Sequence, residues 1–324
     1  TIHNLAYQGL FPSAVLEELG VGWDLFNADG IEFWGKVNFL KAGILFADAV
    51  TTVSERYAAE IQTEEFGCGL EGLLRSRAGM LSGIVNGIDV EVWNPRIDKL
   101  IPANYSEASM TGKGKCKLAL QAEIGLSRDP DVPVIGMISR LADQKGFDLV
   151  AAAADGMLAL GAQFAILGTG EAAHEAAARA LAKRYPGRFS ATIGFNDGLA
   201  HRIEAGADMF LMPSRYEPCG LNQLYSLRYG TVPIVRATGG LDDTIEDVDA
   251  NGTSGTGFKF QDATAEALLG AVRRAVGAYS DAGVWRGIVR RGMARDFSWG
   301  ASAERYARLY RGLMADAVAA RVAG

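Results

Sequence analysis

The sequence predicts an α/β protein built on doubly wound parallel sheets. From residue 132 onward, short apolar segments alternate with longer segments of helical periodicity. The apolar segments carry few polar side chains, as expected for strands that are buried on both faces of a parallel sheet. Polar or glycine-containing loops follow these segments, where strand-to-helix connections are expected.

Six strands are expected in this half of the chain, each followed by a helix. The expected strands cover residues 132–139, 164–170, 189–195, 207–214, 231–240 and 255–260. The expected helices cover residues 147–158, 171–185, 196–206, 220–230, 241–248 and 262–279. We therefore assign residues 132–297 to one doubly wound domain.

Residues 1–95 contain fewer strand-like segments. Residues 36–65 have the pattern of a helix, a strand and a second helix. Residues 80–95 have the pattern of a strand and a turn, followed by a segment that leaves the domain. These are too few strands for a complete sheet, and the chain begins at Thr1 rather than at a methionine. We expect the C-terminal half of another α/β domain, in a fragment whose N-terminal part is missing.

The two remaining segments are expected to connect and to finish the fold. Residues 96–131 are predicted to be a connector with one short helix, and residues 298–324 a terminal amphipathic helix. Six residues of that helix form an apolar set at helical spacing, which predicts core packing. They are Trp299, Tyr306, Leu309, Tyr310, Leu313 and Met314.

Composition excludes several classes of protein. The 324 residues are 49% apolar, which argues against wholesale disorder, and the net charge of −6 argues against a general nucleic-acid binder. No apolar stretch reaches the roughly 18 residues of a membrane helix. The three cysteines, Cys68, Cys116 and Cys219, are far apart and odd in number, which favours a reducing compartment.

Ligands of open parallel sheets bind beyond the carboxyl ends of the strands, so the loops there are the candidate sites. Arg140 and Lys145 are two cations in one such loop, beside the start of a helix. Together they suit a diphosphate, although two solvated surface charges would give the same pattern. The "GTGE" loop at 168–171 lacks the rest of a dinucleotide fingerprint, and a tight turn is its simpler interpretation.

A second loop holds a carboxylate and a thiol where a buried strand ends. Glu217 and Cys219 precede Gly220, which is expected to start a helix. Glu217 could bind sugar hydroxyls or a developing cation, or it could merely cap that helix. Gly239 and Gly240 precede another helix, and they too could cap it or bind a ligand.

No histidine, cysteine or carboxylate cluster shows metal-ligand spacing, and no hydrolase serine elbow or P-loop lysine is present. His3 is the best histidine candidate for a polar active site, although a lone histidine is more often structural. His174 and His201 lie on expected helices, at the surface or behind a site.

Six segments resemble the bacterial glycogen synthases and plant starch synthases. They are "TIHNLAYQGLFP", "KAGILFADAVTTVSERYAAEI", "GIVNGIDVEVWNP", "SRLADQKGFDL", "PSRYEPCGLNQLYSLRYG" and "RATGGLDDTI". Their order and spacing fit the family over nearly the whole chain. The resemblance implies the GT-B fold, with two Rossmann-like domains facing a cleft, of which the N-terminal one is incomplete here. It also implies that the last helix crosses back to the first domain.

The implied activity is a retaining glucosyltransferase that needs no metal and no cofactor. Its expected donor is ADP-glucose and its acceptor the non-reducing end of an α-1,4-glucan. No nucleic-acid or membrane partner is expected. The expected location is the bacterial cytoplasm, or the plastid for a plant protein.

The resemblance also implies roles for single residues. Arg140 and Lys145 match the cations that hold the donor diphosphate, and Glu217 and His3 match groups beside the transferred glucose. Substrate-binding roles are implied for Asn86, Ser139, Gly194, Phe195, Cys219, Gly220, Leu221, Asn222, Gly239, Gly240 and Leu241. Among these, Gly194 and Phe195 flank the nucleotide base, and the amides of residues 239–241 meet the glucose. Cys219 is expected to pack or touch the sugar rather than act as a nucleophile.

Two positions depart from wider patterns. Tyr225 stands where many GT-B enzymes carry a second glutamate, which starch-synthase-like members also lack. Asn222 stands where bacterial members often have threonine. The family's N-terminal glycine-rich loop has no counterpart, so we expect the chain alone to have little or no synthase activity. A non-catalytic glucan- or nucleotide-binding remnant, or another nucleotide-dependent Rossmann enzyme such as a dehydrogenase, is the alternative.

Overall fold

The computed structural model describes residues 1–323, and the side chains of residues 1–315. The chain forms two compact units. One comprises residues 1–86 together with residues 302 onward, and the other comprises residues 87–301. Each unit has its own core, and each is described separately.

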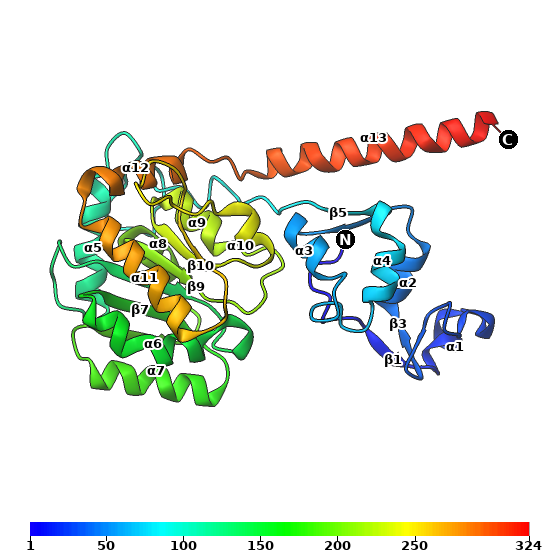
Figure 1. Cartoon of the computed structure of the whole chain (residues 1–324), viewed down its shortest axis with the longest axis horizontal. Coiled ribbons are helices and arrows are strands. Elements are labelled where there is room, and N and C mark those ends of the chain that lie inside the picture. The colour runs from blue at the N-terminus through cyan, green and yellow to red at the C-terminus, as the bar shows by residue number, and fades with distance from the viewer. Residues whose placement is uncertain (324) are drawn as a thin grey trace. The chain divides into compact units, whose positions relative to one another are not determined.

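The larger unit, residues 87–301, is built on a six-stranded parallel sheet (Figure 1). Its strands are β6 (Val134–Ile138), β7 (Gln163–Gly168), β8 (Phe189–Ile193), β9 (Met209–Met212), β10 (Val232–Arg236) and β11 (Phe258–Phe260). Their order across the sheet is β11-β10-β9-β6-β7-β8. The chain therefore builds outward from β6 to β8, returns to the other side of β6, and builds outward again from β9. The predicted doubly wound parallel sheet is confirmed.

Two helical layers cover the faces of this sheet. One layer consists of α6 (Phe147–Ala159), α7 (Ala172–Arg184), α11 (Ala265–Tyr279) and α12 (Ala282–Met293). The other consists of α5 (Thr111–Glu123), α8 (Asp197–Gly206), α9 (Asn222–Tyr229) and α10 (Gly239–Thr244). Strand side chains alternate between the layers, because successive residues of a strand point to opposite faces. Ile135 and Met137 pack into the first layer, whereas Val134 and Ile138 pack into the second.

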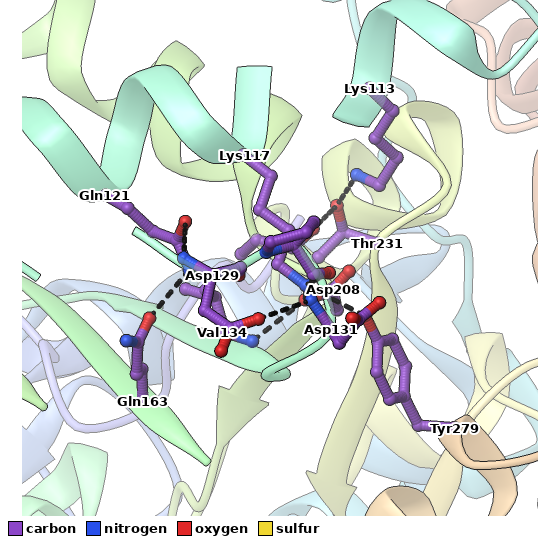
Figure 2. A network of polar contacts seen from close by, with 12 residues as sticks. Lys113, Lys117, Gln121, Asp129, Asp131, Val134, Gln163, Asp208, Thr231 and Tyr279 are labelled. Carbon is purple, nitrogen blue, oxygen red and sulfur yellow. Dashed lines mark hydrogen bonds and ion pairs between the residues drawn. The ribbon is translucent and has the colours of Figure 1, made fainter. Parts of the chain in front are cut away.

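A polar network anchors α5 at the edge of the sheet where the strands begin (Figure 2). Lys117 lies 2.8 Å from Asp208 Oδ2 and also donates to the Pro130 carbonyl and to the Tyr279 hydroxyl. Asp208 Oδ2 accepts a second hydrogen bond from the Val134 amide at 2.8 Å. Because Lys117 is only 4% exposed, its charge needs these partners to be tolerated. The network fixes the ends of β6 and β9 opposite to those that carry the candidate site.

The connector predicted for residues 96–131 was expected to contain one short helix, and α5 lies there as part of the second layer. It packs against α8, and Cys116 and Leu120 on its inner face are buried. The "connector" is therefore in large part a structural element of the larger unit.

The smaller unit contains two short sheets and several short helices. An antiparallel sheet joins β1 (Leu10–Pro12), β3 (Lys36–Asn38) and β2 (Glu32–Phe33), and a parallel pair joins β4 (Val50–Thr52) and β5 (Leu81–Gly83). The helices are α1 (Val15–Leu19), α2 (Phe39–Phe46), α3 (Glu55–Glu60) and α4 (Glu71–Ser76). Single turns of 3-10 helix, η1 (Trp23–Leu25) and η2 (Ala78–Met80), lie between them. The antiparallel sheet was not predicted.

Polar caps set where the helices of the smaller unit begin. The Asn38 side chain accepts the Lys41 amide at the start of α2, and Ser54 accepts the Tyr57 amide at the start of α3. Such caps satisfy amides that have no partner within the helix. Ile2 pairs in parallel with Thr52, so the first residues extend the β4–β5 pair.

The terminal helix α13 (Trp299–Ala323) lies within the predicted residues 298–324, of which residue 324 is outside the described residues, but its apolar set is not a core. Trp299, Tyr310 and Met314 are 52%, 59% and 70% exposed. Periodicity predicted an apolar stripe correctly, but it does not state what covers that stripe. Within the smaller unit, the helix is held by Ser302, which donates to the Val85 carbonyl, and by Arg305, which pairs with Glu55. Within the described residues, no helix is long and apolar enough to cross a bilayer.

Candidate active site

The candidate site lies where the order of strands reverses, between β6 and β9. Both strands are parallel neighbours, so the loops after them leave the same edge of the sheet. Two hydrogen bonds join these loops: the Arg215 amide donates to the Gln144 carbonyl at 2.8 Å, and Gln144 Nε2 donates to the Tyr216 carbonyl at 3.2 Å. This brings the two loops that sequence patterns singled out into direct contact.

Lys145 and Glu217 meet across this junction. Lys145 Nζ lies 2.5 Å from Glu217 Oε2, and the same oxygen accepts the Ser214 hydroxyl at 3.0 Å. Glu217 is only 7% exposed. A buried carboxylate is costly unless it is paired and hydrogen-bonded, and here it is both. Ordinary helix capping does not explain this arrangement, because the side chains of Lys145 and Ser214, from the surrounding loops, bind the carboxylate.

The other residues of the first loop are placed around this pair. Arg140 is exposed, and its guanidinium donates to Gln144 Oε1 at 3.2 Å. The hydroxyl of Ser139 is buried and has no hydrogen-bond partner in the described structure. A buried hydroxyl without a partner is unusual, so Ser139 is available to a ligand that enters the loop. The loop continues through η3 (Asp143–Lys145) into α6.

The start of α9 differs from the prediction. Gly220 has φ of 69°, a left-handed conformation that cannot belong to a right-handed helix, and the helix begins at Asn222. The Asn222 side chain donates to the Ile138 carbonyl at 2.7 Å, which ties α9 to the end of β6. Cys219 is buried, and Leu221 is 38% exposed. Gly220 therefore ends the loop, and it does not start the helix as expected.

The glycine loop before α10 packs on the Glu217 loop. The Gly240 amide donates to the Glu217 carbonyl at 3.0 Å, and the Leu241 amide donates to the Thr238 carbonyl at 3.1 Å. The amides of Gly240 and Leu241 thus have partners within the protein. Their predicted contacts with glucose, and that of Gly239, stay predictions.

Gly194 and Phe195 follow β8, at the same edge of the sheet. The Gly194 amide donates to the Gly168 carbonyl at 3.0 Å, and the Phe195 ring is 92% exposed. An exposed ring at the end of a strand offers a flat apolar surface on which a base can stack. This placement agrees with the expected role beside a nucleotide base, which stays a prediction.

The "GTGE" loop has a structural explanation. A Cβ at Gly168 would lie 1.9 Å from the Ser139 carbonyl oxygen, and Leu141 pairs in parallel with Gly170. The glycines therefore allow the loop after β6 to approach the end of β7. Nothing in this arrangement requires a dinucleotide.

His3 and Asn86 belong to the smaller unit. His3 is exposed beside Ile2, and Asn86 is half-buried at the end of the unit's first segment. Their expected roles stay predictions.

Sequence patterns missed three supporting groups in the larger unit. Asp148 accepts two hydrogen bonds from the Arg215 guanidinium, and Ser214 binds Glu217. His201, expected at the surface or behind a site, is 2% exposed and bonds Asp98 at 2.8 Å. Trp93 stacks on His201 and on Tyr225, with ring centroids 3.9 and 3.8 Å apart. Only Ser214, a hydroxyl directly after a buried strand, offered a local signal.

The structure brings together one group of potential metal ligands that sequence spacing did not indicate. Asp143, Glu171 and His174 bring three ligand atoms within 4.8 Å of one another. Asp143 lies about thirty positions from the other two, so no local motif indicates the group.

Comparison with known proteins gives consistent matches over the whole chain. Residues 1–76 match the model of the starch synthase catalytic domain, and residues 124–279 match that of glycosyl transferases group 1. Glycogen synthases from Anaeromyxobacter sp. (strain Fw109-5) and Anaeromyxobacter dehalogenans (strain 2CP-1 / ATCC BAA-258) are each 58% identical to it over 97% of its length. These alignments cover 66% and 65% of the two relatives.

A solved structure agrees with these matches. The catalytic domain of starch synthase IV from Arabidopsis thaliana, bound to ADP and acarbose, superposes with a TM-score of 0.90 at 35% identity. The match covers 97% of this chain and 66% of that one. The chain thus spans just under two thirds of the length of the relatives that it matches.

Proposed function

Because the chain belongs to the family of glycogen synthases and starch synthases, which have the GT-B fold, we propose that the complete protein is a retaining glucosyltransferase. It transfers glucose from ADP-glucose to the non-reducing end of an α-1,4-glucan. The names of the relatives support the reaction. The starch synthase IV domain, which binds ADP and acarbose, supports an adenine nucleotide and a glucan-like acceptor.

The observation that carries the proposal is the pairing of Lys145 with Glu217 at the switch point of the sheet. It places a cation and a carboxylate within 2.5 Å of each other in a buried setting. Glucosyl transfer from a nucleotide sugar needs both charges, because the leaving diphosphate gains negative charge while the anomeric carbon gains positive charge. A nucleotide-binding domain without transfer chemistry needs only the cation.

We assign the leaving group to the loop after β6. Lys145 and the exposed Arg140 lie on either side of Gln144 and supply two positive charges to one diphosphate. The unpartnered Ser139 hydroxyl can donate to a phosphate oxygen in the same loop. When the donor binds, Lys145 shares its charge between the diphosphate and Glu217. These groups neutralise the charge that a metal ion neutralises in other transferases, so we propose that transfer needs no metal.

The bond changes balance without a further reactant. The acceptor hydroxyl forms a bond to the anomeric carbon on the face from which the diphosphate leaves, and the carbon–oxygen bond to the diphosphate breaks. The hydroxyl proton passes to the departing phosphate oxygen. Glu217 binds sugar hydroxyls and stabilises the positive charge of the glucosyl unit, and it forms no covalent bond to it. His3 and Asn86 are proposed to bind the transferred glucose and the donor.

The remaining partners follow from the same proposal. Phe195 stacks on the nucleotide base, Cys219 lines the sugar pocket, and no nucleic acid or membrane takes part. We place the protein in the bacterial cytoplasm. The three cysteines form no disulfide, as in proteins of reducing compartments, and the two Anaeromyxobacter glycogen synthases are bacterial.

The test is transfer of labelled glucose to glycogen by the complete protein, with ADP-glucose and with UDP-glucose. Faster transfer from ADP-glucose, with the α configuration kept in the product, is the expected result. A chelator should leave the rate unchanged. Binding of ADP and glucan without any transfer would instead favour a binding protein, and inversion at the anomeric carbon would contradict the mechanism.

A further inference from the structure

Three potential metal ligands meet at the carboxyl ends of β6 and β7. Asp143 lies in η3, Glu171 directly precedes α7, and His174 lies in the first turn of α7. One oxygen from each carboxylate and one ring nitrogen lie within 4.8 Å of one another. The group is beside Lys145 in the chain, but its side chains are distinct from those assigned to glucosyl transfer.

The distances suit a small divalent ion. His174 Nε2 lies 3.0 Å from Asp143 Oδ1 and 3.6 Å from Glu171 Oε2. Ligands about 2.0–2.1 Å from a tetrahedral zinc ion are roughly 3.3 Å apart. The two observed separations lie on either side of that value, so small rotations of the carboxylates would complete the coordination.

The ring of His174 is held in place by its surroundings. Its side chain is 12% exposed, and its ring packs edge-on against Phe147 with centroids 5.9 Å apart. The Glu171 amide donates to the Leu141 carbonyl at 2.8 Å, which fixes the start of α7 against the loop after β6. Glu171 is the residue before α7 and His174 lies in its first turn, so the start of the helix brings the two side chains to 3.6 Å from each other.

The two carboxylates outnumber the basic side chains that the structure shows beside them. His174 Nε2 bonds Asp143 Oδ1 and also lies near Glu171, and among the described residues no lysine or arginine forms an ion pair with either carboxylate. A divalent cation would neutralise both carboxylates and would bind all three ligands at once.

We propose that Asp143, Glu171 and His174 bind one divalent transition-metal ion, with zinc as the best fit, and that water fills the remaining coordination position. One imidazole and two carboxylates form a mixed donor set that suits metals of borderline softness better than calcium or magnesium. The ion joins η3 to the start of α7. It takes no part in bond making, and its site is structural.

The experiment measures zinc binding by titration calorimetry, on the purified chain after chelator treatment and dialysis. Every protein carries Cys68→Ser, because Cys68 is an exposed thiol that could bind zinc by itself. The parent should bind one zinc ion per chain. His174→Ala and Asp143→Asn should each weaken binding by at least about tenfold, since even residues behind the ligands change metal affinity about 10–100-fold.

A matched control is Glu175→Gln. It removes a carboxylate from the same helix that bonds Thr169 and Gly170 and lies outside the group. Its zinc affinity should equal that of the parent. Asp143 is on an exposed turn, so its substitution tests the site even where His174→Ala fails to fold. The absence of stoichiometric binding, or equal affinity in Asp143→Asn and the parent, would overturn the proposal.

Discussion

Arg215 and Asp148 form a two-pronged ion pair in which both nitrogen–oxygen distances are 2.7 Å. Arg215 belongs to the loop that carries Glu217, and Asp148 lies in the first turn of α6, which follows Lys145. The pair therefore joins the two loops of the candidate site at a point where neither residue is proposed to touch the sugar. The guanidinium also holds the pKa of Asp148 below its ordinary value, chiefly through these hydrogen bonds.

Replacing Asp148 by asparagine should loosen this joint. Both side chains are 38% exposed, so the expected loss of stability is about 1 kcal/mol or less. The larger effect should be on the donor, with a raised KM for ADP-glucose, because Lys145 and Glu217 lose part of their alignment. Steady-state kinetics and urea unfolding of the complete protein check both. Asp155→Asn, another surface partner of an arginine, is the control. Equal KM values in the two variants would count against a positioning role.

Replacing Glu217 by glutamine should separate binding from chemistry. The side chain keeps its shape but loses the charge that is proposed to stabilise the glucosyl unit, so turnover should fall by about a hundredfold or more. ADP affinity, measured by calorimetry, should change little. Ser214→Ala removes only the hydroxyl that bonds Glu217 and should have a smaller effect. A collapse of ADP affinity with normal turnover per bound donor would refute this role.

Replacing Lys145 by alanine should weaken ADP binding and turnover together. The substitution also leaves Glu217 buried without its cation. Breaking a buried pair costs about 3–5 kcal/mol, and the low end is expected here because the Lys145 side chain keeps 20% of its exposure. Double substitution with Glu217→Gln should recover part of that stability but none of the ADP affinity. Unchanged ADP affinity in Lys145→Ala would exclude a diphosphate role.

The raised pKa of Glu204 leads to a prediction of how the free energy of unfolding depends on pH. Burial raises the pKa of this carboxyl to about 8, although the Ser226 hydroxyl bonds it. A raised pKa means that the folded state holds the proton more strongly, so this contribution is complete below the ordinary pKa of 4.5 and is lost as pH rises toward 8. The free energy of unfolding of the parent should therefore fall from pH 5 to pH 8.

The variant Glu204→Gln has no proton to lose and should show a flatter profile over the same range. Urea unfolding at several pH values measures both profiles. Glu123→Gln, which alters a more exposed carboxylate, should retain the parental slope. Parallel profiles for Glu204→Gln and the parent would show that Glu204 does not titrate in this window.

Lys113 affects the free energy of unfolding at pH values above about 8. Burial lowers its pKa to about 8 in the folded protein, below the ordinary value of 10.5. Between these values the unfolded chain binds more protons, so stability should rise again with pH above about 8. The two groups together predict a minimum of stability near that pH.

The sequence predicted much of the larger unit because its signals are local. Apolar runs such as 209–212 and the helical segments between them appear in the predicted order, since burial on both faces leaves a continuous pattern. The antiparallel sheet of β1, β3 and β2 was missed because its strands are two or three residues long. A period of two cannot be recognised over so few positions.

The candidate site was predicted in part for the same reason. Lys145 and Glu217 each lie in a loop that follows a buried strand, and the rule for parallel sheets places both loops at one edge. Their pairing itself is a contact between residues 72 positions apart. For His201 the sequence left two alternatives open, at the surface or behind a site, because its partners Asp98 and Trp93 are distant in the chain, and its burial excludes the surface alternative. The group of Asp143, Glu171 and His174 was missed for a similar reason.

The network that anchors α5 and the loops of the candidate site lie at opposite edges of the sheet, so residues that stabilise the fold are separated from residues proposed to act in catalysis. Lys117 and Asp208 hold the strands where they begin, and the loops of the site leave the strands where they end. A mutational library should therefore divide by position. Changes near Lys117 would lower yield without altering catalytic constants, whereas changes in the loops after β6 and β9 would alter those constants at normal yield. Donor preference could thus be redesigned at one end of the sheet while the other end is left untouched.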